Sequence, residues 1–436
     1  MSSLLVINIF FFFVGILLFC KKRSYTIYYF LTWKIAGAFL CDMFLFPVEN
    51  NLFETFGKYS NLYIYACLIL TFFTDKINTL KKGSIILMSF CIFLIYIIGL
   101  ALFRETITPF FFNYILQYFT WVALFLLLPS LELKLSQIRN FSYFLLIVEL
   151  VLFFLQDNGI ALTTYSKQVD FFFYAPPGTY YRYNFYASGI SCIIIFLMLI
   201  ELVIRKKVST LQFIIYIAGS ATIYLSGSRT ALIAYVLTCC IILLKVFYKR
   251  IKYFIIPVLF LIPTLYGILL TNQSNSDFGA NVGERQANIL AIFSDNGYYL
   301  TEESTFGLSV KMFNYLINNL QSLLFGAGRL FTSQLGYNYV KIESSTDATL
   351  MVYICETGII GFIFLIYFLI YTLQVKKEYR FFSYAFLGFF IILTITDIGL
   401  FYTHDFAFFL VLMFFLKNSS VSRRDFILKS NRITKS

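Results

Sequence analysis

The chain alternates between long apolar runs and short polar breaks from its first residues to about residue 416. A helix that crosses a bilayer needs roughly 20 mostly apolar residues. We therefore expect an all-α, polytopic integral membrane protein with about 12–13 transmembrane helices. The expected spans are 2–20, 25–47, 60–74, 84–103, 109–129, 141–155, 185–204, 208–225, 230–247, 253–270, 350–374, 382–396 and 398–416.

Composition supports the membrane interpretation. Sixty per cent of the residues are hydrophobic and 13% are charged, whereas soluble domains carry roughly a quarter charged residues. We expect one transmembrane domain over 1–436, with a first helix that is retained, because Lys21, Lys22 and Arg23 follow its apolar run instead of preceding it.

The 8 cysteines show neither a CxxC pair nor metal-ligand spacing, and a single histidine excludes a multi-histidine metal site. No metal and no cofactor are expected.

The distribution of positive charge predicts an orientation. Basic clusters occupy alternate loops, which the positive-inside rule assigns to the cytoplasm. This pattern assigns the net charge of +12 to membrane topology and not to nucleic acid. The clusters are Lys21–Arg23, Lys76/Lys81/Lys82, Lys134/Arg139, Arg205–Lys207, Lys249/Arg250/Lys252, Lys376/Lys377/Arg380 and a basic cytoplasmic tail over 417–436.

Three polar segments then fall on the non-cytoplasmic face: the loop 156–184, the turn Ser226-Gly227-Ser228-Arg229, and a large loop over 271–349. Within the large loop, Val310 to Leu324 has apolar residues near helical spacing. This spacing predicts an amphipathic helix, which we expect to fold onto the membrane surface.

Arginine is the characteristic cation of this outer face. A guanidinium binds phosphate oxygens in a bidentate manner and stays protonated, so the outward arginines suit a diphosphate head group carried by a lipid. The alternative for each is snorkelling to lipid phosphates or pairing with a carboxylate. The candidates are Arg182, Arg229, Arg285 and Arg329.

Arg229 is the most informative of them. It lies in a turn of few residues between two apolar spans, where backbone N–H groups could also cradle an anion. An arginine this close to hydrocarbon is costly without a partner. The alternative is a helix-capping turn with a snorkelling arginine.

Two further residues could act as the general base. Asp347 immediately precedes the span that contains Glu356-Thr357-Gly358-Ile359-Ile360-Gly361, so it is either a helix N-cap or a carboxylate that accepts a hydroxyl proton. His404, the only histidine, lies beside Asp405 near the outer end of the last span. It is either a base near neutral pH or an interfacial polar residue.

Three glutamates are functional candidates by depth alone, with no matching partner evident in the sequence: Glu149, Glu201 and Glu356.

Residues 180–375 resemble the O-antigen polymerase and O-antigen ligase superfamily of bacterial envelope enzymes. The resemblance rests on a long outward loop and on motifs in a fixed order: Tyr181-Arg182-Tyr183-Asn184, Ser226-Gly227-Ser228-Arg229-Thr230-Ala231, Leu324-Phe325-Gly326-Ala327-Gly328, and Asp347 followed by Glu356-Thr357-Gly358-Ile359-Ile360-Gly361. It implies a GT-C-like, metal-independent, inverting glycosyltransferase. Such enzymes act at the periplasmic face of the bacterial inner membrane on undecaprenyl-diphosphate-linked glycans, and the resemblance implies diphosphate contacts for Arg182, Arg229 and Arg285.

Two departures from the family pattern matter. Members often carry an arginine about twenty residues before the Gly-x-Gly, where this chain has Gly307 to Lys311, so Arg285 is either displaced by an insertion or unrelated. Ligases typically have a histidine beside the position of Thr346-Asp347, and its absence favours a polymerase of O-antigen, capsule or exopolysaccharide.

The rival interpretations are a ligase that transfers polymer to lipid A core and a non-enzymatic flippase of lipid-linked oligosaccharides. A long outward loop without inverted repeats disfavours the flippase. The expected partners are undecaprenyl-diphosphate-linked oligosaccharides and the lipid bilayer, with a chain-length regulator protein as a candidate and no nucleic acid.

Overall fold

The computed structural model describes residues 3–44, 52–74, 84–103, 111–158, 160, 183–226, 228–247, 305–327, 349–396 and 403–417. All regular structure in these ranges is helical, as expected. The helices are α1 (Ser3–Lys21), α2 (Tyr25–Phe44), α3 (Leu52–Thr74), α4 (Ser84–Phe103), α5 (Phe111–Leu127), α6 (Leu135–Asp157), α8 (Tyr183–Met198), α9 (Thr210–Leu225), α10 (Arg229–Val246), α13 (Thr305–Asn318), α14 (Leu320–Phe325), α16 (Thr349–Thr372), α17 (Arg380–Thr396) and α18 (Thr403–Lys417). A π-helical turn, η3 (Leu199–Arg205), continues α8.

Each expected span coincides with a helix except 253–270, which lies outside the described residues. The main differences are at helix starts: α3 begins at Leu52 instead of residue 60, and α6 begins at Leu135 instead of residue 141. The apolar-run criterion excludes these first turns because they contain Lys58 and Arg139, although charged side chains are compatible with helical backbone.

Not every helix is long enough to cross a bilayer by itself. Among the described residues, three helices have both the length and the apolar composition of a membrane span: Leu135–Asp157, Tyr186–Arg205 and Tyr353–Thr372. Shorter apolar helices accompany them at Leu5–Lys21, Leu87–Phe103, Phe119–Ser130, Thr210–Leu225 and Thr230–Val246. The larger count of spans stays a prediction.

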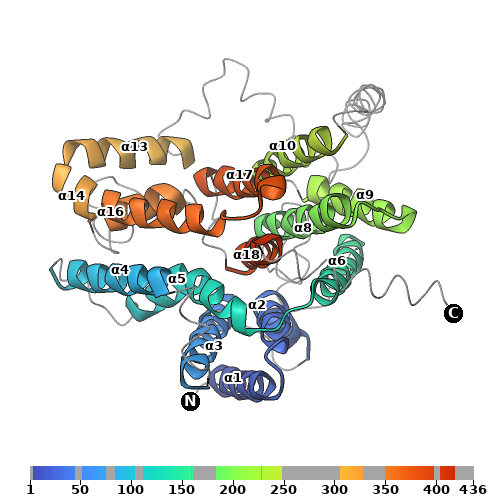
Figure 1. Ribbon diagram of the computed structural model, residues 1–436, viewed down its shortest axis with the longest axis horizontal. Helices are drawn as coiled ribbons and strands as arrows, with labels where there is room; N and C mark the ends of the chain where they lie inside the picture. Colours follow the sequence, from blue (N-terminus) through green and yellow to red (C-terminus); the bar gives the residue numbers. More distant parts are fainter. Residues whose placement is uncertain are drawn as a thin grey trace.

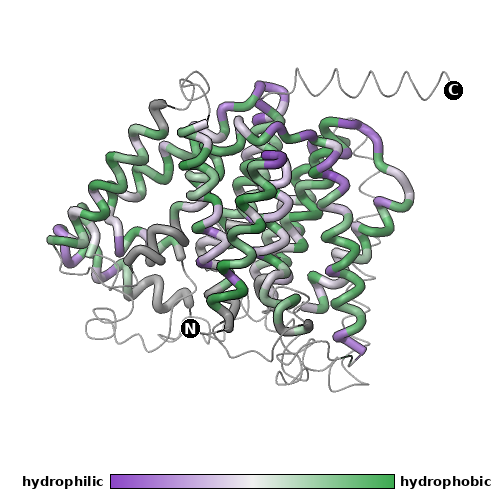
Figure 2. Tube along the Cα trace, turned by 90° about the horizontal axis from the view of Figure 1, so that it is seen from below, coloured by the Kyte–Doolittle hydropathy of each residue, from purple (hydrophilic) through white to green (hydrophobic). Residues whose placement is uncertain are grey.

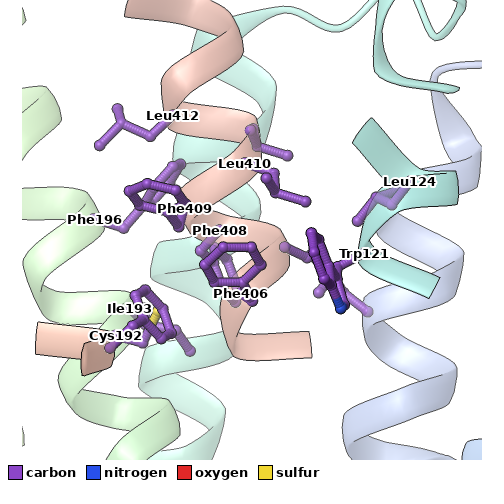
Figure 3. Packing of buried hydrophobic residues seen from close by; sticks show 14 of the residues in the cluster. Trp121, Leu124, Cys192, Ile193, Phe196, Phe406, Phe408, Phe409, Leu410 and Leu412 are labelled. Atoms are coloured by element: carbon purple, nitrogen blue, oxygen red, sulfur yellow. The ribbon is translucent and has the colours of Figure 1, made fainter. Parts of the chain in front are cut away.

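Helix α18 occupies the centre of the bundle, between α8 and α5 (Figure 1). Every side chain from Asp405 to Met413 is buried, and so is every one from Tyr186 to Glu201 on α8 and η3. A helix buried on all sides needs apolar residues on every face, which explains the continuous apolar runs of both segments. Figure 3 shows Phe406, Phe408 and Phe409 packed between Trp121 and Phe196.

Aromatic contacts fix the relative directions of the helices. Phe153, near the end of α6, stacks on Tyr186, near the start of α8, with ring centroids 5.1 Å apart. Phe390, late in α17, contacts Phe406, early in α18, at 5.2 Å. Each of these pairs is therefore antiparallel. Ser188 and Phe196 of α8 contact Asp405 and Phe408 of α18 in the same order, so these two helices are parallel. Together with the short connections that follow α8, α9 and α16, this makes α8, α10, α16 and α18 parallel, so that all start on one side of the bundle.

Hydrophilic residues are concentrated at the upper edge of Figure 2, where these parallel helices finish, and we call this the basic end because it includes Arg205, Lys245 and Lys417. There the Lys245 ammonium lies 5.1 Å from the ring centre of Phe381, and that of Lys417 lies 4.7 Å from the ring centre of Tyr371. Arg205 forms an ion pair at the same end. Loops that the charge pattern assigned to one side thus lie together in space.

The expected amphipathic helix over 310–324 is present but divided. It is split between α13 and α14 at Asn319, whose Oδ1 accepts a hydrogen bond from the Ser322 amide at 3.1 Å and so caps α14. Met312 and Leu316 are buried against Cys355 of α16. Helix α16 is itself interrupted at Gly358, where the backbone is non-helical (φ 68°, ψ −170°).

Candidate functional site

The end opposite the basic end, called the site end, is the side of the bundle on which α8, α10, α16 and α18 begin. The start of a helix carries unpaired backbone N–H groups and a partial positive charge. Several such starts facing one side favour a negatively charged ligand there.

The candidate residues relate to this end as follows. Arg229 is the first residue of α10 and His404 belongs to the first turn of α18; the side chains of both fall outside what the structure describes. Arg182 directly precedes α8 and Asp347 shortly precedes α16, and both lie outside the described residues. The structure therefore puts the helix starts to which these four residues belong or lead on one side of the bundle. It does not place Arg285 or Arg329, which also lie outside the described residues.

Asp405 connects two of these helix starts. Its side chain is 2% exposed, and its Oδ2 accepts a hydrogen bond from the Ser188 hydroxyl of α8 at 3.2 Å. The Cys192 thiol donates to the backbone oxygen of Asp405, also at 3.2 Å. These bonds fasten the first turn of α18, which includes His404, to α8. In the sequence, the feature that could have indicated this role for Asp405 was its position as an acidic residue inside an apolar run.

The turn between α9 and α10 is held by its serines. The Ser226 hydroxyl is buried and donates to the Ile223 carbonyl at 2.6 Å. Ser228 occupies the N-cap position of α10, but its side chain makes no capping hydrogen bond. Ser228 thus occupies the position that the helix-capping interpretation expects, but its side chain does not cap the helix. Arg229 is the first residue of that helix.

Comparison with known proteins adds no assignment. No family model matches the chain, and no curated protein shows significant similarity to its sequence. The resemblance drawn from the motifs therefore stays a prediction, although the arrangement of two of those motifs is visible in the structure.

The motifs around Gly326 and Gly358 contact each other backbone to backbone. Both glycines have positive φ, 81° and 68°, a region that side-chain-bearing residues rarely adopt. A Cβ on Gly358 would lie 2.5 Å from the Gly326 amide nitrogen, and the Ala327 amide donates to the Cys355 carbonyl at 2.8 Å. Only glycine permits this approach at either position.

Tyr96 of α4 completes this junction. Its hydroxyl lies 2.6 Å from the Phe325 carbonyl oxygen and 3.1 Å from that of Thr357, and can donate to either. Sequence reasoning missed Tyr96, because no local pattern links it to residues so distant along the chain.

Glu201, a candidate by depth, has a structural environment at the basic end. Arg205 reaches its Oε2 at 2.6 Å and Gln212 donates to its Oε1 at 2.9 Å, with Arg139 3.8 Å away. The Tyr143 hydroxyl lies 3.4 Å from Oε1. These partners account for the buried charge without any ligand. The Arg205 contact was readable from its spacing of four residues.

The other acidic candidates are also buried. Glu149 is 1% exposed on α6, and Glu356 is 4% exposed beside the kink of α16. Within the described ranges, no group of three His, Cys, Asp or Glu side chains could hold a metal ion.

Proposed function

We propose that this chain is a polysaccharide polymerase of the bacterial inner membrane that joins undecaprenyl-diphosphate-linked oligosaccharides at the periplasmic face. The observation that carries the proposal is that α8, α10, α16 and α18 run parallel and therefore all begin on the side opposite the basic residues. The positive-inside rule assigns the basic end to the cytoplasm, which leaves the site end facing the periplasm.

The proposed topology extends beyond the described residues. It comprises about 12–13 transmembrane helices in a GT-C-like arrangement, with 271–349 as a periplasmic loop. The three long apolar helices and the shorter apolar ones packed around them support this topology.

The proposed reaction is a single displacement. The hydroxyl oxygen of the acceptor's terminal sugar bonds to the anomeric carbon of the donor glycan, while the bond from that carbon to the diphosphate oxygen breaks. The hydroxyl proton passes to Asp347 or His404, and undecaprenyl diphosphate leaves with the bonding electron pair. Attack from the face opposite the leaving group inverts the anomeric configuration.

The site end supplies the electrostatics for this step. Negative charge develops on the departing diphosphate, and fixed positive groups aimed at it lower the barrier. Arg229 at the start of α10 and Arg182 just before α8 would provide guanidinium groups, and the helix starts would provide backbone N–H groups. Asp405 would act as a positioning residue, because its bond to Ser188 holds the turn that carries His404.

Replacement of Arg229 tests the proposal. In cells that lack the native gene, Arg229→Ala should lower polymer formation at least about 100-fold, as expected for removal of one donor to a developing anion. The protein should stay in the membrane, and single repeat units should accumulate on the lipid carrier. Arg229→Lys should recover part of the activity, since it restores charge but not the bidentate contact. Polymer of normal length from Arg229→Ala would refute the proposal.

A matched control comes from the basic end. Lys417→Ala removes an exposed cation that lies over Tyr371, and it should leave polymer length unchanged.

Analysis of the lipid-linked intermediates separates the rival functions. Long polymer that stays on the undecaprenyl carrier and never reaches lipid A core would identify a ligase, whereas single units trapped at the cytoplasmic face would identify a flippase.

A further inference from the structure

The segment formed by α13 and α14 carries apolar residues on its buried side and also on part of its exposed surface. Its inner side, Met312 and Leu316, packs against α16. Its outer side exposes large apolar side chains to at least two fifths of their area: Phe313 53%, Ile317 56%, Leu320 66%, Leu324 40% and Phe325 47%. The exposed polar residues between them, Asn314, Asn318, Asn319 and Gln321, are all uncharged.

These exposed apolar residues, which we call the stripe, lie on two successive helices. Phe313 and Ile317 are one turn apart on α13, and Leu320 and Leu324 are one turn apart on α14, beyond the break at Asn319. An exposed apolar stripe of this kind marks contact with a membrane or with another protein.

The depth of the segment distinguishes these two partners. Helices α4 and α16 are antiparallel, because Phe93 stacks on Phe364 at 4.1 Å while Tyr96 bonds to the Thr357 carbonyl. At about 1.5 Å per residue, Tyr96 lies about 18 Å from Ser84, where α4 begins at the basic end. The same rise places Gly358 about 21 Å from Thr372, where α16 ends.

Both lengths are shorter than the hydrocarbon core of a bilayer, which is about 30 Å thick. Tilt of either helix would shorten its span along the membrane normal further. With Ser84 and Thr372 at the cytoplasmic boundary of the hydrocarbon layer, the junction of Gly326 with Gly358 lies within that layer, in the half nearer the site end, and α14 reaches down to it.

Irregular backbone at that depth is tolerated only where protein satisfies its polar groups. This condition is met at the junction. Gly326 and Ala327 are buried, the Ala327 amide donates to Cys355, and the Tyr96 hydroxyl lies within bonding distance of the Phe325 and Thr357 carbonyls.

We propose that α13 and α14 form a re-entrant element whose exposed stripe lies among the acyl chains of the outer leaflet. The surface beside it has the same character: Ile360 and Ile363 of α16 and Ile95 and Leu102 of α4 are exposed by 38–70%. The stripe thus continues the apolar surface of two helices that themselves face lipid. The assignment to the outer leaflet rests on the topology of the proposed function, whereas the depth of the stripe in the membrane does not depend on catalysis.

Spin labels can measure this depth. Single cysteines replace Phe313, Ile317 and Leu320 in the full-length chain, in a background where the exposed Cys20, Cys91 and Cys240 are alanine. The protein is reconstituted in phosphatidylcholine–phosphatidylglycerol vesicles, and label collisions are measured with oxygen, which concentrates in the bilayer, and with a water-soluble nickel chelate. All three labels should favour oxygen, and a control label at exposed Lys377 should favour nickel.

Two outcomes would overturn the proposal. Preference for nickel at positions 317 and 320 would place the stripe in water, and exclusion of both reagents would show that another protein covers it. A second variant pair guards against misfolding of the labelled chains: Ile317→Asp should lower thermal stability in vesicles, whereas Asn314→Asp, on a neighbouring exposed residue, should lower it less. Loss of polymerase activity would change none of these results, so the two proposals fail separately.

Discussion

The two ends of the bundle are held together by different chemistry. At the basic end, side chains satisfy one another: Glu201 binds Arg205 and Gln212 and lies near Arg139. At the site end, helices meet through backbone, as at Gly326 and Gly358, or through a single side chain against a neighbouring helix, as in the Ser188–Asp405 bond. Substitutions at the two ends should therefore distinguish stabilisation by side-chain bonds from stabilisation by backbone contact.

The largest effect on stability is expected for Gly358→Ala. The substitution forces a side chain onto a backbone with φ of 68° and places its Cβ 2.5 Å from the Gly326 amide nitrogen and the Leu324 carbonyl oxygen. Backbone strain costs about 1–3 kcal/mol, and overpacking adds about the same again. Thermal unfolding in detergent, followed by size-exclusion chromatography, should show a marked loss of folded protein.

Gly388→Ala is the matched control, because a Cβ at this position of α17 meets no atom within 4 Å. Alanine is about 1 kcal/mol better than glycine inside a helix, so this variant should be as stable as the parent or more so. Equal stability of the two variants would show that backbone contact does not hold the site end.

Glu201→Ala probes the basic end and should come next in size. It leaves Arg139 and Arg205 without their shared carboxylate, and both guanidinium groups are partly exposed, at 18% and 27% of their side-chain area. Water therefore screens them, and the loss should be about 2 kcal/mol instead of the full cost of an unpaired buried charge. Glu201→Gln, which keeps the shape and an oxygen acceptor, should lose less. Polymer made by folded Glu201→Gln protein should have normal length, and a shorter product would assign this residue a part in function.

The apolar pattern of the sequence predicted the presence of the helices better than it predicted where they start. Apolar runs predicted nearly every described helix, because burial in a bilayer or in the bundle requires apolar residues whatever the packing. The starts of α3 and α6 were not predicted by this criterion, since they contain the charged Lys58 and Arg139 although their backbone is helical. The alternation of basic loops also predicts one side of the membrane for Arg229 and His404, and the helices to which they belong, α10 and α18, begin on the same side of the bundle.

Contacts between distant segments could not be predicted in this way. The glycines at 326 and 358 indicate special backbone, yet neither shows that the other is its partner. Tyr96 and Arg139 acquire their roles from helix packing, which the order of residues along one helix does not specify. The Asp405–Ser188 bond joins residues that are 217 positions apart.

A smaller effect is expected for Tyr143→Phe. The two hydroxyls of Tyr143 and Tyr216 lie 2.6 Å apart and link α6 to α9 beside Glu201. Removal of one hydroxyl should cost about 1 kcal/mol, because the ring remains and only a hydrogen-bond partner is lost. The chemical denaturation midpoint of purified protein measures this change. A loss as large as that of Glu201→Ala would make the tyrosine pair, and not the carboxylate, the centre of the cluster.

Ser209→Ala should have the smallest effect. Ser209 caps α9 through a reciprocal pair of bonds with Gln212, whose amide group also donates to Glu201. Loss of such a cap costs about 0.5–2 kcal/mol, with the lower part of that range expected at this exposed position. Because Gln212 serves both partners, the double variant with Glu201→Gln should deviate from additivity. Strict additivity would show that the cap and the ion cluster are independent.

The central position of α18 constrains how the bundle is assembled in the cell. This helix is synthesised after α2, α5, α8, α16 and α17, yet it packs against all of them. While the ribosome is still making α17, the face of α8 that carries Ser188, Cys192 and Phe196 lacks its final neighbour. The earlier helices must therefore leave the insertion machinery in a loosely packed state, and they close around α18 only when it arrives. Stop codons or frameshifts just before residue 403 should yield a chain that inserts but is rapidly degraded.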